Sequence, residues 1–215
     1  MSEIIPGILT HNYSDYAGRI EQVEKAGLEW AHIDIMDGQF VPNITVMPHE
    51  FMGLQTSLKL EAHLMVFQPE RYYSDLTVAR VQRVLIHREA YQSIDALQQA
   101  IHLARDYFAE VGIVFNPATP RDLPPDAVPD CILSMGVQPG ASGQPFIDAT
   151  YTAIEKTVQQ FPQTVHEVDG GVHEDNIAQL QKSGISRFVI SSHLFVGYTI
   201  VEQLQMFNSL LKETS

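Results

Sequence analysis

The sequence contains a single cysteine, Cys131, among its 215 residues. A disulfide within the chain is therefore impossible, which fits a reducing compartment, and we expect a cytoplasmic protein. No apolar run reaches the roughly 18 residues that a membrane-spanning helix needs, so the sequence predicts no membrane partner. Residues 1–6 lack the basic and apolar segments of a secretory signal, and we expect none.

Basic residues are also scarce, because 13 Lys and Arg compare with 26 Asp and Glu, and the formal net charge is −13. Nucleic-acid binding requires a basic surface that displaces phosphate counterions, so we expect no nucleic-acid partner. The negative charge does not exclude a small phosphorylated ligand. Backbone N–H groups at the start of a helix can hold a phosphate whatever the global charge.

Short apolar, β-branched segments alternate with longer helical segments along the chain. We expect strands at residues 4–9, 30–36, 58–66, 83–87, 111–115, 131–137, 164–169 and 187–191. We expect clear helices at 14–26, 93–109, 147–161, 174–183 and 200–212, and weaker ones near 48–55, 69–76 and 121–128. This alternation predicts a parallel sheet, and units of about 25 residues favour a closed (β/α)8 TIM barrel over an open doubly wound sheet. We expect one domain over residues 1–215.

Helix ends carry recognisable signals. Ser14 and Ser93 are expected to cap the helices that follow them, and Gly27 and Gly184 to end helices. The proline-rich stretch 121–129 cannot form a long regular helix, so we interpret it as a degenerate helix and not as a domain boundary.

Imidazole and carboxylate side chains gather near the ends of three predicted strands. His32 and Asp34 alternate with apolar neighbours, His63 does the same, and Asp169 shares a face with Glu167. These strand ends meet at the active-site mouth of a barrel, where such ligands suit Zn²⁺, Fe²⁺, Mn²⁺ or Co²⁺. A single strand histidine is more often structural, and Asp before Gly is more often a turn, so the residues alone leave both interpretations open.

Small residues follow the last three predicted strands, where barrels often bind phosphate with the loops and the start of an extra helix. They are Gly140, Ala141, Ser142 and Gly143 after the sixth strand, Gly170 and Gly171 after the seventh, and Ser191 and Ser192 after the eighth, before a short helix expected at 193–196. A plain turn is the alternative for each loop. The remaining histidines are expected on the pocket wall (His87, His193) or at the surface and in loops (His11, His49, His102, His166, His173).

Several of these segments resemble signatures of the ribulose-phosphate 3-epimerase family. They are HIDIMDGQFVPN at 32–43, AHLMV at 62–66, NPATP at 116–120, PGASGQ at 139–144 and EVDGGV at 167–172, in order between residue 4 and about residue 195. The resemblance implies a (β/α)8 barrel of the ribulose-phosphate-binding type. It also implies inversion of C3 of D-ribulose 5-phosphate to give D-xylulose 5-phosphate, a step of pentose phosphate metabolism, in a homo-oligomer that is a dimer or larger.

The resemblance further implies roles for individual residues. One divalent metal ion (Zn, Fe, Mn or Co) would be bound by His32, Asp34, His63 and Asp169. Asp34 and Asp169 would also be the acid–base pair, because inversion removes a proton from one face of C3 and adds one to the other, through an enediolate that the metal stabilises. The methionines that line the reacting carbons would be Met36, Met65 and Met135, for which core packing is the alternative.

The sequence departs from the family pattern where the sugar and phosphate would bind. Gly7 takes the substrate-contacting position in the usual Pro-Ser-Ile-Leu, so a hydroxyl is missing there. The other departures are Gly136 for Thr, Ala141-Ser142 for Phe-Gly, and Ser191 for Gly. They leave open another ketose phosphate, such as a hexulose 6-phosphate, or a non-catalytic sugar-phosphate-binding barrel. A decarboxylase or an amino-acid biosynthesis isomerase is disfavoured, because Lys59 is the only lysine in the predicted strands and stands at a strand start.

Overall fold

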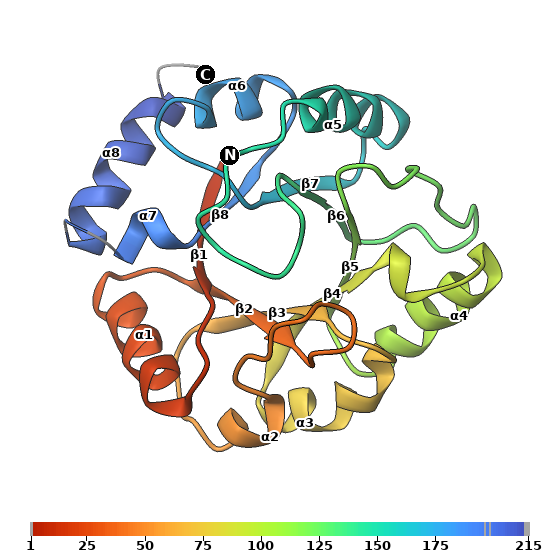
Figure 1. Ribbon diagram of the computed structural model, residues 1–215, viewed down its shortest axis with the longest axis horizontal. Helices are drawn as coiled ribbons and strands as arrows, with labels where there is room; N and C mark the ends of the chain where they lie inside the picture. Colours follow the sequence, from red (N-terminus) through yellow and green to blue (C-terminus); the bar gives the residue numbers. More distant parts are fainter. Residues whose placement is uncertain (1, 196, 198, 213–215) are drawn as a thin grey trace.

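The computed structural model describes residues 2–195, 197 and 199–212. Over this part of the chain, eight parallel strands close into a barrel in sequence order, with helices around the outside (Figure 1). The strands are β1 (Glu3–Ile8), β2 (Trp30–Met36), β3 (Lys59–Met65), β4 (Val81–His87), β5 (Glu110–Phe115), β6 (Cys131–Met135), β7 (Val165–Asp169) and β8 (Arg187–Ile190). The predicted (β/α)8 barrel is confirmed.

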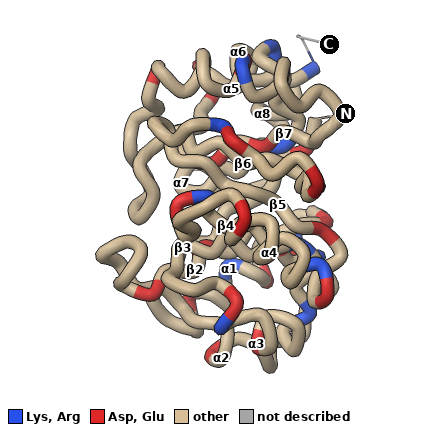
Figure 2. Tube along the Cα trace, turned by 90° about the vertical axis from the view of Figure 1, so that its right-hand side faces the viewer, with Lys and Arg blue, Asp and Glu red and all other residues tan. Residues whose placement is uncertain are grey.

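The connections between strands contain helices of very different length. They are α1 (Tyr13–Lys25), α2 (Pro48–Phe51), α3 (Tyr73–Val78), α4 (Ile94–Arg105), α5 (Ala149–Gln160), α6 (Ile177–Lys182), α7 (Ser192–Phe195) and α8 (Ile200–Lys212), with 3-10 turns at Pro69–Tyr72 and Arg88–Ala90. Figure 2 views the barrel from the side, with α2 and α3 at the bottom of the picture and α5 and α6 at the top. No helix among the described residues is long and apolar enough to span a membrane.

Two local predictions are wrong. Residues 121–128 form no helix, because prolines at 124, 125 and 129 remove backbone donors and restrict the residues before them. The cap of α1 is Asn12 and not Ser14, since the Asn12 side chain accepts a hydrogen bond from the Asp15 N–H at 2.9 Å. Ser93 does cap α4, and Gly27 and Gly184 end helices with φ of +74° and +101°. The helix expected at 193–196 is α7, and residue 196 lies outside the described residues.

Strand alternation divides the barrel into an outer apolar layer and an inner mixed layer. Outward residues such as Ile33, Ile35 and Leu64 are almost completely buried in the largest apolar cluster, beneath the helices. Inward residues of β4, β5, β6 and β8 pack against one another, namely Leu85, Val114, Leu133, Met135 and Val189. The inward residues of β2, β3 and β7 are mostly polar, and they create the site at the mouth of the barrel.

Candidate metal centre

The paired register of β2 and β3 brings the polar residues together. Asp34 pairs with His63, and His32 pairs with Glu61, so their inward side chains are neighbours. Asp169 ends β7 on the other side of β1 and β8. One ligand atom from each of His32, Asp34, His63 and Asp169 lies within 4.8 Å of the others, and all four residues are buried. The structure therefore brings together the four predicted metal-binding residues.

The spacing of these four atoms suits one divalent ion. Asp34 Oδ1 lies 3.4 Å from His32 Nε2 and 3.0 Å from His63 Nδ1, and the two nitrogens are 3.2 Å apart. Asp169 Oδ2 lies 3.9 Å and 3.5 Å from the same two nitrogens. Ligands about 2.0–2.2 Å from a tetrahedral ion are about 3.3–3.6 Å from one another, so the donor set fits such an ion.

A hydrogen bond to Glu61 fixes the proton of His32. His32 Nδ1 donates to Glu61 Oε1 at 2.6 Å, because an ionised carboxylate can only accept. Burial acts to raise the pKa of Glu61, but its contacts with His32 and Arg83 outweigh burial and keep this carboxylate ionised, and Arg83 Nη1 donates to the other carboxylate oxygen at 2.5 Å. Nε2 is therefore the ring nitrogen of His32 that faces the cluster, where a bound ion would take its lone pair.

A second chain of hydrogen bonds fixes the proton of His63. His87 Nδ1 donates to Glu89 Oε2 at 3.1 Å, and burial lowers the pKa of His87 to about 4, so the imidazole is neutral and its Nε2 is an acceptor. His63 Nε2 donates to it at 2.9 Å, so Nδ1 is the nitrogen of His63 that faces the cluster. Two ring nitrogens and two carboxyl groups thus converge, a donor set that could bind a cation.

The two aspartates differ in proton affinity. Burial raises the pKa of Asp169 to about 6, and the neighbouring charge of Asp34 adds to this rise. Burial also acts to raise the pKa of Asp34, but the contacts with His32 and His63 outweigh it and hold this pKa well below its usual range. Different environments around two nearby carboxyl groups are typical of an acid–base pair.

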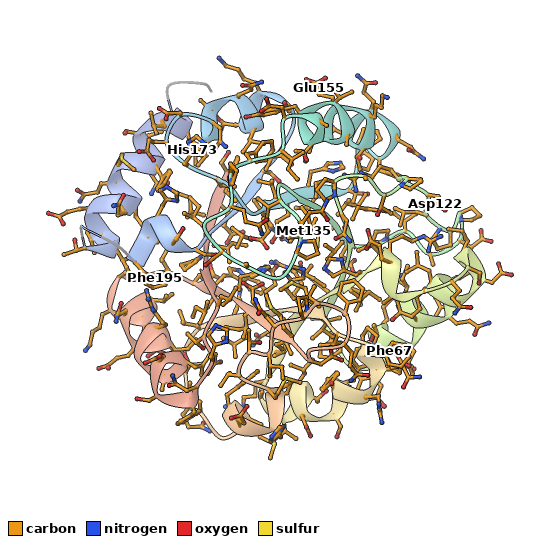
Figure 3. The ribbon with its side chains drawn as sticks, viewed as in Figure 1. Phe67, Asp122, Met135, Glu155, His173 and Phe195 are labelled. Atoms are coloured by element: carbon orange, nitrogen blue, oxygen red, sulfur yellow. The ribbon has the colours of Figure 1, made fainter. Side chains whose placement is uncertain are left out.

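A cavity of about 310 Å³ opens above the cluster at the barrel mouth. Asp34 and Asp169 line its floor, while His32 and His63 are completely buried and lie outside its lining. Met36, Met65 and Met135 line the cavity, each at most 2% exposed, and Figure 3 shows Met135 near the centre of the barrel. The predicted phosphate residues also line it, namely Gly140, Ala141, Ser142, Gly143, Gly170, Gly171, Ser191 and Ser192. The cavity therefore joins the candidate metal centre to the candidate phosphate loops.

Comparison with known proteins identifies the family. The family model described as the ribulose-phosphate 3 epimerase family matches residues 3–195. The chain belongs to the ribulose-phosphate 3-epimerase family. A protein named ribulose-phosphate 3-epimerase from Synechocystis is 34% identical over 89% of this chain and 86% of its own length. The protein of the same name from Bacillus subtilis is 32% identical over 91% and 93%. This confirms the predicted resemblance and the predicted class of enzyme, an isomerase.

More distant solved structures agree in fold alone. Phosphoribosyl anthranilate isomerase from Thermus thermophilus is 15% identical, with a TM-score of 0.67 over 99% of this chain and 100% of that chain. The tryptophan synthase complex from Pyrococcus furiosus contains a chain that is 12% identical, with a TM-score of 0.64 over 100% and 99%. Their shared barrel says nothing about the reaction of this family member.

The loop after β6 extends over the mouth of the barrel (Figure 1), and its residues 139–145 line the cavity. Gln144 Nε2 donates to the carbonyl oxygens of Gln138 and Ala141 at 2.8 and 2.9 Å, which holds the loop in a compact turn. Asn43 Nδ2 donates to Gly140 O at 2.5 Å and ties this loop to the one after β2. The loop is thus held in place by side chains outside the run 140–143.

Two departures from the family pattern are explained by packing. A Cβ on Gly136 would lie 2.1 Å from Gly170 O and 2.6 Å from the Phe146 ring, so neighbouring atoms already fill that space. A Cβ on Gly7 would lie 2.2 Å from Ser191 Oγ. Gly7 does not line the main cavity and instead lines a smaller adjoining one with Ser142, Ser191 and Ser192.

Sequence reasoning missed several residues that support the site. Two chains of hydrogen bonds orient the histidines of the candidate metal centre, one through Glu61 and Arg83 and one through His87 and Glu89. The sequence predicted only a pocket-wall position for His87 and nothing for the others. The signal available was alternation, since Glu61 shares the face of His63. His166, expected at the surface or in a loop, is buried on β7 and bonds Phe161 O at 2.9 Å. His173 lies in the loop after β7, as expected, and with His193 it lines the cavity.

Proposed function

We propose that this chain is a metal-dependent ketose-phosphate 3-epimerase that interconverts D-ribulose 5-phosphate and D-xylulose 5-phosphate. The observation that carries the proposal is the buried cluster of His32, Asp34, His63 and Asp169, at the floor of a cavity whose other end is formed by small-residue loops. The names of the relatives from Synechocystis, Bacillus subtilis and Arabidopsis thaliana support this substrate.

The metal would be held by the same four residues. Bound there, a divalent ion acts as a Lewis acid that stabilises negative charge developing on the substrate oxygens. The hydrogen bonds from His32 to Glu61 and from His63 to His87 keep the imidazole rings in the required tautomers. Zinc, iron, manganese and cobalt all suit this mixture of nitrogen and oxygen donors.

Asp34 and Asp169 would carry out the two proton transfers. They project from β2 and β7, with β1 and β8 between them, so a substrate in the cavity has one carboxyl group on each of two sides. One carboxylate removes the C3 proton and the other carboxyl group returns a proton to the opposite face. Met36, Met65 and Met135 would form an apolar wall that limits access of water to the reacting carbons.

The far end of the cavity would bind the phosphate. Gly140, Gly143, Gly170 and Gly171 all have positive φ, which glycine adopts in tight turns, and their backbone N–H groups would donate to the phosphate. Ser142 and Ser192 add hydroxyl groups to the same lining. Neutral donors of this kind can hold a phosphate in a protein with a formal charge of −13.

A hexulose 6-phosphate is the second candidate substrate. Ala141 and Ser142 line the cavity, and the departure of this loop from the Phe-Gly that the resemblance implies supports a sugar phosphate of different length. A cytoplasmic location and assembly into homo-oligomers are further parts of the proposal. The first is supported by the single buried thiol of Cys131, and the second by family resemblance.

Hydrogen exchange at C3 tests the proposed function. The metal-loaded protein is incubated with D-ribulose 5-phosphate in D₂O, and deuterium at C3 and formation of xylulose 5-phosphate are followed by NMR. We expect deuterium at C3 and formation of xylulose 5-phosphate, and we expect both reactions to stop when a chelator removes the metal. A hexulose 6-phosphate in a parallel reaction tests the second candidate. Bound metal without exchange in either substrate would contradict the proposal and favour a non-catalytic barrel.

A further inference from the structure

The Ser191 hydroxyl lies in the space that a side chain on Gly7 would need. β1 and β8 pair in parallel with Pro6 opposite Ile190, so Gly7 and Ser191 follow as neighbours at the mouth. A Cβ on Gly7 would lie 2.2 Å from Ser191 Oγ and 3.0 Å from Val189 Cγ1. Gly7 is not among the glycines with positive φ, so its backbone is open to other residues. A side chain at position 7 would therefore require the Ser191 hydroxyl to turn out of its present position.

The Ser191 hydroxyl is available to a ligand. Ser191 is partly exposed and lines the same cavity as Asp34 and Asp169. Ser192, the next residue, lines it as well. Its carbonyl oxygen accepts a hydrogen bond from the Leu194 N–H at 3.1 Å, which anchors the turn into α7. Among the described residues, no hydrogen bond joins Ser191 Oγ to the protein. A fixed backbone with a free hydroxyl in the cavity is a typical substrate contact.

Gly7 and Ser191 together place one hydroxyl at this part of the mouth. Gly7 offers no side chain, and the Ser191 hydroxyl lies in the space beside it. We propose that Ser191 Oγ binds a hydroxyl of the sugar phosphate, in the place that a residue-7 side chain would otherwise take. Ser191 would then determine affinity for the sugar. The inference rests on the proposed function, because it takes a sugar phosphate as the ligand of the cavity.

The test uses three variants and a ligand that cannot react. D-Ribitol 5-phosphate has the hydroxyls and the phosphate but no ketone, so its dissociation constant from the metal-loaded protein, measured by calorimetry, reports binding alone. Ser191→Ala removes the hydroxyl. The double variant Gly7→Ser/Ser191→Gly returns a hydroxyl on β1, and the matched control Gly7→Ala/Ser191→Gly returns the Cβ without it. Thermal unfolding of each variant shows that it is folded.

We expect Ser191→Ala and Gly7→Ala/Ser191→Gly each to weaken binding about three- to tenfold, the usual effect of one neutral hydrogen bond. Gly7→Ser/Ser191→Gly should restore binding, and with D-ribulose 5-phosphate the changes should appear in KM and not in kcat. Unchanged binding in Ser191→Ala, or equal binding by the two double variants, would overturn the assignment. If the variants show this binding pattern but the wild-type protein has no turnover, the role of Ser191 stands and the proposed function is refuted.

Discussion

The Nε2 atoms of His63 and His87 lie 2.9 Å apart, in a hydrogen bond that fixes which nitrogen of His63 is directed at the metal cluster. The two rings are also stacked, with centroids 5.0 Å apart. His87 is completely buried and does not line the cavity, so it can influence metal binding without touching the substrate.

We therefore expect His87→Phe to weaken metal binding about 10- to 100-fold, because His63 would lose the partner that sets its tautomer. Competition with a chelator of known affinity measures the loss, and turnover should recover at saturating metal. His102→Phe, on the exposed side of α4, is the matched control. Metal affinity equal to that of the control would show that the tautomer of His63 does not depend on His87.

Asp34→Asn and Asp169→Asn should each lower turnover by about two to four orders of magnitude, since each removes one proton transfer. With D-ribulose 5-phosphate in D₂O, the variant that retains the abstracting base should still exchange C3–H slowly without forming xylulose 5-phosphate. Metal content, measured on the same samples, separates loss of the acid–base group from loss of the ion. Turnover within tenfold of the wild type at full metal content would contradict the assigned roles.

Glu89 links the end of β4 to the loop after β5. It accepts hydrogen bonds from His87 Nδ1, from Thr119 Oγ1 and from the Asn116 N–H. Burial acts to raise its pKa, but the hydrogen bonds outweigh burial and lower the pKa of Glu89 from 4.5 to about 2. The Glu89 carboxylate is thus protonated more readily in the unfolded chain than in the folded chain.

It follows that Glu89 stabilises the fold fully above about pH 4.5, and that this contribution is lost as the pH falls toward 2. At about 1.4 kcal/mol per pKa unit, the contribution is at most about 3 kcal/mol. Glu89→Gln should have a lower free energy of unfolding at pH 6 and a shallower loss of stability below pH 4.5. Urea unfolding at several pH values measures both, and parallel pH profiles for the two proteins would disprove the assignment.

The strands were the most predictable part of the fold. The bounds of β2 match the prediction, because its apolar outer face and its end at Asp37-Gly38 are both local features. Strand–helix alternation predicts a weak helix at 121–128, but the prolines of this segment exclude one. The sequence predicted Ser14 as a cap and the structure has Asn12, because both residue types cap helices and only the backbone geometry distinguishes them.

The part of the site that strand alternation determines could be predicted from the sequence. Alternation and parallel pairing placed His32, Asp34, His63 and Asp169 at one mouth. They could not show that Arg83 reaches Glu61, or that Gly7 makes room for Ser191, because barrel closure and side-chain packing determine both contacts. Gly7 and Ser191 looked like unrelated departures in the sequence, whereas the structure places them next to each other at the mouth of the barrel.

Arg83 is completely buried beneath the metal centre, between two carboxylates. Its Nη1 donates to Glu61 at 2.5 Å, its Nε donates to Glu110 at 2.7 Å, and its guanidinium lies 3.9 Å from the centroid of the Trp30 ring. Glu110 is one-third exposed and can be hydrated, but Glu61 is completely buried. Removing Arg83 would therefore leave the buried Glu61 charge with the hydrogen bond from His32 but without its guanidinium partner.

We expect Arg83→Leu to lower the free energy of unfolding by about 3–5 kcal/mol, as is usual when one partner of a buried ion pair is lost. Glu61→Gln/Arg83→Leu should lose clearly less than the sum of the two single variants, because no buried charge remains. Urea unfolding in the presence of a chelator measures all four proteins without a contribution from metal. A strictly additive cycle would mean that Arg83 stabilises the barrel by packing on Trp30 and not by neutralising the carboxylate that orients His32.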